Sequence, residues 1–273
     1  MSDETSYPSL RGKVAIVTGG GRGIGEATAR RLAAAGASVV IGDIRDDLGR
    51  GVAESLGPAA RYVHLDVTSR EDWRNAVEFA QRTFGDPGIL VCNAGIMLSG
   101  PFEKAAPDDF RLAFETNAMG AVHGIQAVLD PMRAGGGGSV VIVSSVAGQA
   151  GIEGLSAYCT SKAANTMIAR CAAIELAQYN IRVNSVHPSK VDTPMSNSSA
   201  VASVVGSSGS PDLPPLGRIA AAQDVAALIA FLVSDDAAFV TGVQHVIDGG
   251  RQAGYKYSAN AASEKLAIAL SGD

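Results

Sequence analysis

Tyr158 and Lys162 have the residue types and the spacing needed for proton transfer. They stand four positions apart, and on a helix that spacing puts both side chains on the same face. A tyrosine has a pKa of about 10, and a nearby ammonium together with a bound cofactor cation favours its phenolate, so we expect the pKa of Tyr158 to move toward neutrality. Ser145 lies upstream, where its hydroxyl could bind a substrate oxygen as charge develops. The trio predicts that Tyr158 takes a proton from an alcohol or gives one to a ketone.

A tyrosine and a lysine at this spacing also occur on solvated helix faces, so the prediction needs support from elsewhere in the chain. Residues 18–25 read T-G-G-G-R-G-I-G, between an apolar run at 14–17 and an Ala/Arg-rich helical pattern. A strand, a glycine turn and a helix bind the pyrophosphate of a dinucleotide, because small residues let the backbone approach the phosphates and the helix start supplies N–H groups. The predicted contacts in this turn are Gly19, Arg22, Gly23, Ile24 and Gly25.

The acidic residue Asp43 follows the glycine turn by about 20 residues, where a carboxylate can accept hydrogen bonds from ribose hydroxyls. The 2′-phosphate of NADP, at about 4 Å from that carboxylate, would be repelled by a few kcal/mol, so we predict NAD as the cofactor. Two alternatives stay open: Arg22 could hold a phosphate, and Asp43 could merely cap the next helix. Further predicted cofactor contacts follow the strands, at Ile44, Asp66, Val67, Asn93, Ala94 and Gly95.

Strand and helix patterns alternate along the chain, which predicts a doubly wound, Rossmann-type parallel sheet in one α/β domain at 11–250. Ser69 is the expected N-cap of the third helix, with Asp72 in a capping-box position. Asn117 is a poor residue for the middle of a helix, and we expect it to mark a kink that holds a water linking Lys162 to solvent. The predicted strands are 14–17, 38–43, 61–67, 89–93, 139–144, 181–186 and 245–247, and the other helices are 24–35, 48–55, 108–132, 157–178 and 223–233.

Three segments lie outside this pattern. Residues 192–216 are rich in Ser, Gly and Pro and follow the carboxyl end of a strand, so we expect a lid over a ligand. Residues 1–10 are an N-terminal extension, and residues 251–273 are a C-terminal extension with a short helix at 262–270.

Composition excludes several classes of function. The chain has 273 residues and a formal net charge of -5, which gives no electrostatic case for nucleic acid or an anionic membrane. Its apolar runs are too short for a membrane span. The four histidines are scattered, so we expect no metal site. The three cysteines lack metal-ligand spacing and residues 1–10 have no apolar signal core, so we expect a cytoplasmic protein.

Taken together, these motifs resemble the short-chain dehydrogenase/reductase family from about Leu10 to Gly250. The resemblance rests on the glycine turn, Asp43, Asp66-Val67, N-A-G at 93–95, Asn117, S-S-x-x-G at 144–148, Tyr158 with Lys162, and V-I-D-G-G at 246–250. It implies a catalytic tetrad of Asn117, Ser145, Tyr158 and Lys162, with Ser144 structural and with Tyr158 and Lys162 also touching the cofactor. It further implies nicotinamide contacts from Pro188, Val191 and Thr193. Two positions depart from the family pattern: Cys92 replaces an asparagine and Ser189 replaces a glycine.

The expected substrate is a hydrophobic secondary alcohol or ketone, cyclic or steroid-like, because the segments expected to border it are mostly apolar. Segment 181–195 is also similar to bacterial hydroxysteroid dehydrogenases of the family. A 3-oxoacyl thioester reductase and a non-catalytic NAD-binding protein remain alternatives. Helices 108–132 and 157–178 carry many apolar positions, and the resemblance implies that they pair between subunits, so we expect a homotetramer. The expected substrate border comprises Ile96, Met97, Leu98, residues 149–152, Met195, Val201, Val204 and Leu213.

Overall fold

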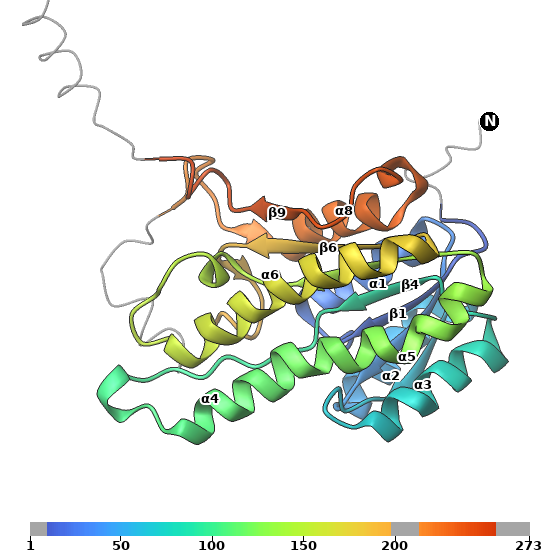
Figure 1. Ribbon diagram of the computed structural model, residues 1–273, viewed down its shortest axis with the longest axis horizontal. Coiled ribbons are helices and arrows are strands. Elements are labelled where there is room, and N and C mark those ends of the chain that lie inside the picture. Colours follow the sequence, from blue (N-terminus) through green and yellow to red (C-terminus); the bar gives the residue numbers. More distant parts are fainter. Residues whose placement is uncertain (1–9, 198–212, 255–273) are drawn as a thin grey trace, which may run out of the picture.

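A parallel β-sheet forms the centre of the protein (Figure 1). The computed structural model describes residues 10–197 and 213–254, and within them the sheet has seven strands in the order β3-β2-β1-β4-β5-β6-β9. The order reverses between β1 and β4, and ligands of open α/β sheets bind beyond the carboxyl ends of the strands at such a point. The strands are β1 Val14–Thr18, β2 Ser38–Asp43, β3 Ala60–His64, β4 Ile89–Cys92, β5 Gly138–Val143, β6 Ile181–Pro188 and β9 Gln244–Ile247.

Helices cover both faces of this sheet (Figure 1). One apolar cluster joins α1, α2 and α8 to the sheet, and a second cluster joins α3, α5 and α6 to its other face. This arrangement confirms the predicted doubly wound α/β fold. The helices are α1 Gly23–Ala34, α2 Asp46–Leu56, α3 Arg70–Thr83, α4 Pro107–Phe114, α5 Gly120–Ala134, α6 Ser156–Leu176 and α8 Ala222–Val233.

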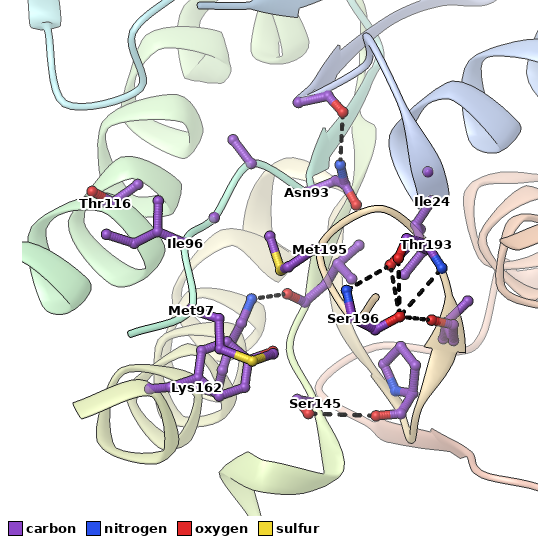
Figure 2. A pocket seen from close by; sticks show the side chains of 18 of the residues that line it. Ile24, Asn93, Ile96, Met97, Thr116, Ser145, Lys162, Thr193, Met195 and Ser196 are labelled. Atoms are coloured by element: carbon purple, nitrogen blue, oxygen red, sulfur yellow. Dashed lines mark hydrogen bonds between the residues drawn. The ribbon is translucent and has the colours of Figure 1, made fainter. Parts of the chain in front are cut away.

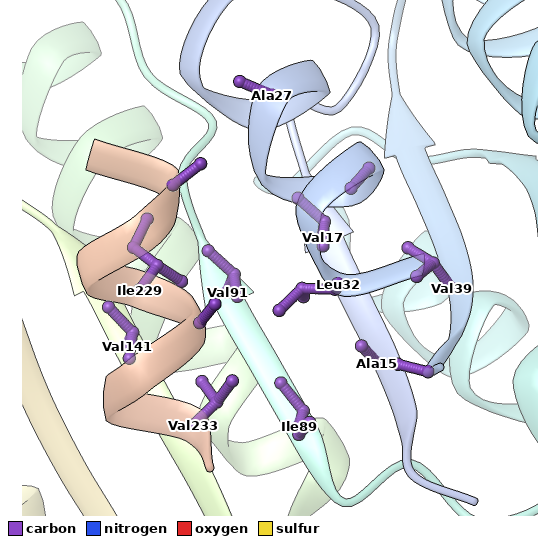
Figure 3. Packing of buried hydrophobic residues seen from close by; sticks show 14 of the residues in the cluster. Ala15, Val17, Ala27, Leu32, Val39, Ile89, Val91, Val141, Ile229 and Val233 are labelled. Atoms are coloured by element: carbon purple, nitrogen blue, oxygen red, sulfur yellow. The ribbon is translucent and has the colours of Figure 1, made fainter. Parts of the chain in front are cut away.

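The core is apolar on both sides of the strands, as expected for a parallel sheet covered by helices. All five residues of β1 are buried. On one face Leu32 of α1 and Ile229 of α8 pack in the same cluster as Val91 of β4 (Figure 3). This packing fixes the strands, and therefore fixes where their carboxyl ends present the residues that follow them.

The predicted single helix at 108–132 is interrupted. Glu115–Met119 forms a π-helical turn between α4 and α5, and π turns insert one extra residue, often at functional sites. The turn contains Asn117, so the predicted kink is confirmed. Its cause is that the Asn117 side chain bonds to the chain at Ile96 and to Ser161 rather than to its own helix.

Other boundaries also differ from the prediction. Strand β3 ends at His64 rather than at residue 67, because the Asp66 carboxylate accepts hydrogen bonds from the Thr68 N–H and hydroxyl and so begins a turn. Strand β6 runs on to Pro188. The sequence did not indicate the small sheet that pairs β7 Val191–Asp192 with β8 Ala220–Ala221. The predicted cap of α3 is confirmed, since the Ser69 hydroxyl accepts a hydrogen bond from the Asp72 N–H at 3.1 Å.

Parts of the predicted extensions and lid fall outside the described residues. The described flanks of the 192–216 segment are residues 192–197 and 213–216, and the 262–270 helix lies wholly beyond the described chain. Residues 214–216 pack near the end of β9, where the Leu216 N–H donates to the Gly249 carbonyl at 3.1 Å. None of the helices that the structure describes has the length and apolar character needed to cross a bilayer.

Candidate active site

A cavity of about 750 Å³ lies at the carboxyl edge of the sheet (Figure 2). Its lining comes mainly from the segments that follow β1, β2, β3, β4, β5 and β6 and from the first half of α6. Ligands of open α/β sheets bind at this edge, beside the point where the strand order reverses. Of the predicted site residues, Gly25 and Asn117 are absent from the described lining, and the following belong to it: Gly19, Arg22, Gly23, Ile24, Asp43, Ile44, Asp66, Val67, Asn93, Ala94, Gly95, Ser145, Tyr158, Lys162, Pro188, Val191 and Thr193.

The glycine turn brings the start of α1 close to the ends of two strands. A Cβ on Gly25 would lie 2.1 Å from the Gly19 carbonyl oxygen, so only glycine permits this approach. Asn93, which follows β4, donates from its side-chain amide to the carbonyls of Thr18 and Gly19 at 2.9 and 3.1 Å. Asn93 therefore holds the turn in place.

The start of α1 has the character of an anion-binding end. Its N-cap residue is Arg22, whose side chain makes no capping hydrogen bond within the described chain. The first N–H groups of a helix have no partner within it and carry the positive end of its dipole. Together with the close approach at Gly25, this arrangement fits the pyrophosphate of a dinucleotide.

Asp43 is held by two backbone donors. Its Oδ2 accepts from the Gly21 N–H and its Oδ1 from the Arg45 N–H, each at 2.9 Å. The carboxylate thus bonds both to the glycine turn and to the start of α2. A residue that only capped the helix would make the second bond alone. The side chain is buried yet lines the cavity, and each oxygen retains a lone pair for a further donor.

Tyr158 and Lys162 lie in the first half of α6 and are both buried. The Lys162 Nζ donates to the Val143 carbonyl at 2.8 Å and lies 5.7 Å from the centre of the Tyr158 ring (Figure 2). Burial lowers the pKa of Lys162 to about 8. Burial raises the pKa of Tyr158 to about 12, and a hydrogen bond with Ser145 opposes that rise in part.

Burial acts on Tyr158 against the effect expected from spacing: in the protein alone, desolvation is the largest cause and raises the pKa of the tyrosine. The lysine amine is bound to the Val143 carbonyl, and desolvation disfavours its charge as well. The lowering of the Tyr158 pKa by Lys162 together with a nicotinamide cation stays a prediction.

The Ser145 hydroxyl is positioned but weakly engaged. Its oxygen accepts from the Ala147 N–H at 3.1 Å, and it donates to the Pro188 carbonyl at 3.4 Å (Figure 2). The second distance is at the long limit for an O–H donor, so a substrate oxygen could replace that carbonyl. Ser144 differs, because its hydroxyl donates to the Lys162 carbonyl at 2.8 Å, which fits a structural role.

Asn117 lies behind the cavity. Its Oδ1 accepts from the Ile96 N–H at 2.7 Å, and its Nδ2 donates to the Ile96 carbonyl and to the Ser161 hydroxyl, each at 2.9 Å. These bonds fasten the segment after β4 to α6. The water link from Asn117 to Lys162 stays a prediction.

The substrate border is partly as expected. Ile96, Met97, Ile152 and Met195 line the cavity, while Leu98, residues 149–151 and Leu213 do not, and Val201 and Val204 lie outside the described residues. Several further residues that line the cavity were not predicted. Leu112 and Thr116 stand four positions apart, and this helical spacing could have indicated them. Tertiary packing, which the sequence does not show, brings in others such as Val146, Leu155 and Arg251.

Cys92 and Ser189, the two departures from the family pattern, have different contacts in the structure. Cys92 is buried in the apolar cluster under α3 and α5, and burial raises the pKa of its thiol to about 12. Ser189 donates its N–H to the Ile247 carbonyl at 3.2 Å and lines the cavity. Cys92 therefore acts in packing, while Ser189 joins the end of β6 to β9.

Replacing Gly95 with alanine should disturb the site. A Cβ there would lie 2.8 Å from the Asn117 Oδ1 and 3.6 Å from the Lys162 Nζ, and the asparagine cannot yield without breaking its bonds to Ile96. We expect Gly95→Ala to lower the free energy of unfolding by about 1–3 kcal/mol, measured by chemical denaturation. Gly100→Ala is the matched control, because a Cβ there meets nothing within 4 Å. Equal stability of the two variants would contradict this account.

Comparison with known proteins agrees with this geometry. The family described as "Enoyl-(Acyl carrier protein) reductase" matches residues 19–252. The 3-alpha-(or 20-beta)-hydroxysteroid dehydrogenase of Mycobacterium tuberculosis is 41% identical over 249 residues, covering 91% of this chain and 93% of that protein. The trans-4-hydroxycyclohexanecarboxylate dehydrogenase of Sinomonas cyclohexanicum is 41% identical over 251 residues (89% and 93%), and the cyclopentanol dehydrogenase of Comamonas testosteroni is 39% identical over 256 residues (91% and 98%).

These matches span most of the chain and include the glycine turn, the Ser145 segment and the Tyr158/Lys162 pair within one aligned length. They agree with the parallel sheet and with the cavity at its carboxyl edge. The chain belongs to the short-chain dehydrogenase/reductase family, whose members use a nicotinamide cofactor.

Proposed function

We propose that the protein is an NAD-dependent dehydrogenase that interconverts a hydrophobic secondary alcohol and its ketone. One observation carries the proposal: Tyr158, Ser145 and Lys162 line the same cavity as Asp43 and the glycine turn. Acid–base groups and a dinucleotide-binding turn in one cavity are what hydride transfer coupled to proton transfer requires.

The nicotinamide, when bound, accepts hydride from an alcohol or donates it to a ketone. Tyr158 moves the proton at the substrate oxygen, and Ser145 exchanges its weak bond to Pro188 for a bond to that oxygen. Since burial raises the pKa of Tyr158, the phenol is ready to give a proton to a developing alkoxide, and alcohol oxidation first requires its ionisation. Lys162 would supply the positive charge that favours this ionisation and a donor for the ribose. Pro188, Val191 and Thr193, which line the cavity, would hold the nicotinamide.

Asp43 supports NAD over NADP. Its carboxylate is fixed between the glycine turn and α2, so it cannot move away from a 2′-phosphate without breaking both bonds. Like charges brought close in this way give specificity through repulsion. Ile44, Asp66 and Val67 would hold the adenosine end of the cofactor, and Asn93, Ala94 and Gly95 would contact its middle, since all six line the cavity.

The cavity favours an apolar substrate. The relatives named above are dehydrogenases of hydroxysteroids and of cyclic alcohols, and we extend that class of substrate to this chain. Apolar walls with a few polar groups at one end bind such molecules. The apolar lining residues around Tyr158 are Ile96, Met97, Leu112, Val146, Ile152, Leu155 and Met195.

Two alternatives are less well supported. The matching family's description names an acyl thioester reductase, but we expect such an enzyme to use NADPH, which Asp43 disfavours, and to bind an acidic carrier, for which the net charge of -5 gives no basis. A protein that only senses NAD would have no need for Ser145 and Tyr158 in a buried, hydrogen-bonded arrangement.

We also propose a homotetramer in the cytoplasm. Phe114 of α4 and Met167 and Ile174 of α6 are exposed large apolar side chains, which suits pairing with another copy. The three cysteines form no disulfide in the part of the chain that the structure describes, which is consistent with a reducing compartment.

Cofactor preference tests the role of Asp43. With NAD the wild-type kcat/KM should exceed that with NADP by about tenfold or more, because the carboxylate repels the 2′-phosphate. Asp43→Asn should reduce the ratio of kcat/KM with NAD to kcat/KM with NADP, mainly by raising kcat/KM with NADP. Asp66→Asn is the matched control, since Asp66 also lines the cavity and bonds a nearby N–H, and it should keep the ratio. Equal use of both cofactors by the wild type would refute the assignment.

The Tyr158 hydroxyl is tested by Tyr158→Phe. Losing the transferable proton should lower kcat by on the order of a hundredfold or more, with NADH binding retained. In the wild type, oxidation should speed up as the pH rises from about 6 to about 8, because the raised pKa of Tyr158 leaves little phenolate at neutrality and Lys162, with a pKa of about 8, keeps most of its charge in that range. Reduction should stay nearly constant. Cys159→Ala, at the adjacent position, should behave as the wild type. Wild-type turnover by the phenylalanine variant would exclude this mechanism.

Substrate class is tested with a panel of alcohols and NAD. Oxidation of cyclopentanol, cyclohexanol and a 3α-hydroxysteroid should become more efficient with size, by up to about fourfold in kcat/KM for each methylene buried. Sorbitol and a 3-hydroxyacyl thioester serve as polar and thioester comparisons and should react poorly. A clear preference for either would overturn the apolar-substrate assignment while leaving hydride transfer in place.

A further inference from the structure

His187 is a fully buried titratable side chain that the mechanism above does not use. It lies near the carboxyl end of β6, one residue before Pro188. Successive side chains of a strand point to opposite faces, so His187 and Ser185 share one face while Val186 packs in the apolar cluster on the other. The shared face lies toward Ser145, to which the histidine is bonded.

The hydrogen bonds of His187 define its tautomer. Its Nδ1 lies 3.0 Å from the Ser145 carbonyl oxygen, and its Nε2 lies 2.8 Å from the Ser185 hydroxyl. A carbonyl can only accept, so Nδ1 carries the hydrogen, and in a neutral ring Nε2 then accepts from the hydroxyl. The neutral ring is the expected form, because burial lowers the pKa of His187, although its bond to the Ser145 carbonyl opposes part of that fall.

The hydrogen bond from His187 to Ser145 extends the contact between β5 and β6 beyond their paired residues. The last residues paired between β5 and β6 are Val143 and Val186, and the Ser144 N–H donates to the Val186 carbonyl at 2.9 Å. Ser145 comes next, where the chain leaves the sheet for the turn at Val146–Gly148. The imidazole of His187 supplies the next link, from β6 to the Ser145 carbonyl.

The Ser145 carbonyl therefore accepts hydrogen bonds from two donors. One is His187 and the other is the Gly148 N–H at 2.9 Å. The Ser145 hydroxyl, by contrast, donates a long bond to Pro188 and lies within hydrogen-bonding reach of Tyr158. The main chain of the serine is thus fixed while its hydroxyl can turn to a substrate, and a fixed donor is worth more in a transition state than one that must be ordered during the reaction.

We propose that His187 is a positioning residue for Ser145: its neutral ring clamps the serine carbonyl to the end of β6, and Ser185 orients the ring through its bond to Nε2. The proposal rests on the proposed function, in which the Ser145 hydroxyl binds the reacting oxygen. His187 touches neither substrate nor cofactor and acts through the serine.

The kinetic test compares four variants with the wild type. His187→Leu keeps an apolar side chain of similar size but lacks the donor, so kcat for cyclohexanol oxidation should fall by about tenfold or more while KM for NAD changes by less than about twofold. In His187→Asn the Nδ2 can stand in for Nδ1, and kcat should return to within about threefold of the wild type. Ser185→Ala should give an intermediate loss. Val186→Ala, on the opposite face of β6, should lower stability without changing kcat per folded enzyme.

A second measurement does not depend on turnover. In protein labelled with 15N-histidine, the nitrogen shifts of His187 should report a neutral ring protonated at Nδ1, and Ser185→Ala should change the Nε2 shift while Nδ1 stays protonated. This spectrum also serves if His187→Leu fails to fold. A ring protonated at Nε2 in the wild type, or an unchanged kcat in a folded His187→Leu variant, would overturn the proposal. An inactive wild type would instead overturn the proposed function, while the tautomer would still show whether the clamp exists.

Discussion

The site depends on the docking of α6 against the carboxyl end of β5. Two hydrogen bonds run in opposite directions across this contact: Lys162 donates its amine to the Val143 carbonyl, and Ser144 donates its hydroxyl to the Lys162 carbonyl. The contact is close, because a Cβ on Gly148 would lie 2.7 Å from that same Lys162 carbonyl. This docking buries the lysine, brings Tyr158 beside Ser145, and sets the pKa values of both α6 side chains through desolvation.

A second close approach builds the cofactor half of the cavity, where α1 is held against the ends of β1 and β4 by the space left at Gly25 and by the bonds of Asn93. The two halves meet where the strand order reverses. The sheet core is apolar and packed from both faces, so it can hold the two halves of the cavity at a fixed separation. In the proposed function that separation sets the distance between nicotinamide and substrate, on which the rate of hydride transfer depends steeply.

Much of the fold and many of the cavity-lining residues could be predicted from the sequence, because their signals are local. Apolar runs define buried strands, and the glycine turn and the Tyr158/Lys162 spacing are short patterns. The rest depends on partners far away in the chain. The π turn forms because Asn117 bonds to Ile96 and Ser161, and the positions of Leu155 and Arg251 at the cavity follow from tertiary packing. Spacing also gave no sign that burial raises the pKa of Tyr158, since spacing reports a neighbouring charge but not the loss of water.

The central claim is that this cavity transfers hydride from the carbon of a secondary alcohol to a nicotinamide while Tyr158 handles the proton. Isotope tracing tests it most directly. With cyclohexanol deuterated at C1 and unlabelled NAD, the account predicts cyclohexanone together with NADH that carries one deuterium at C4 of the nicotinamide, seen by NMR and mass spectrometry, and no exchange of that deuterium with water. Ketone formed with unlabelled NADH, or deuterium released to solvent, would contradict the account.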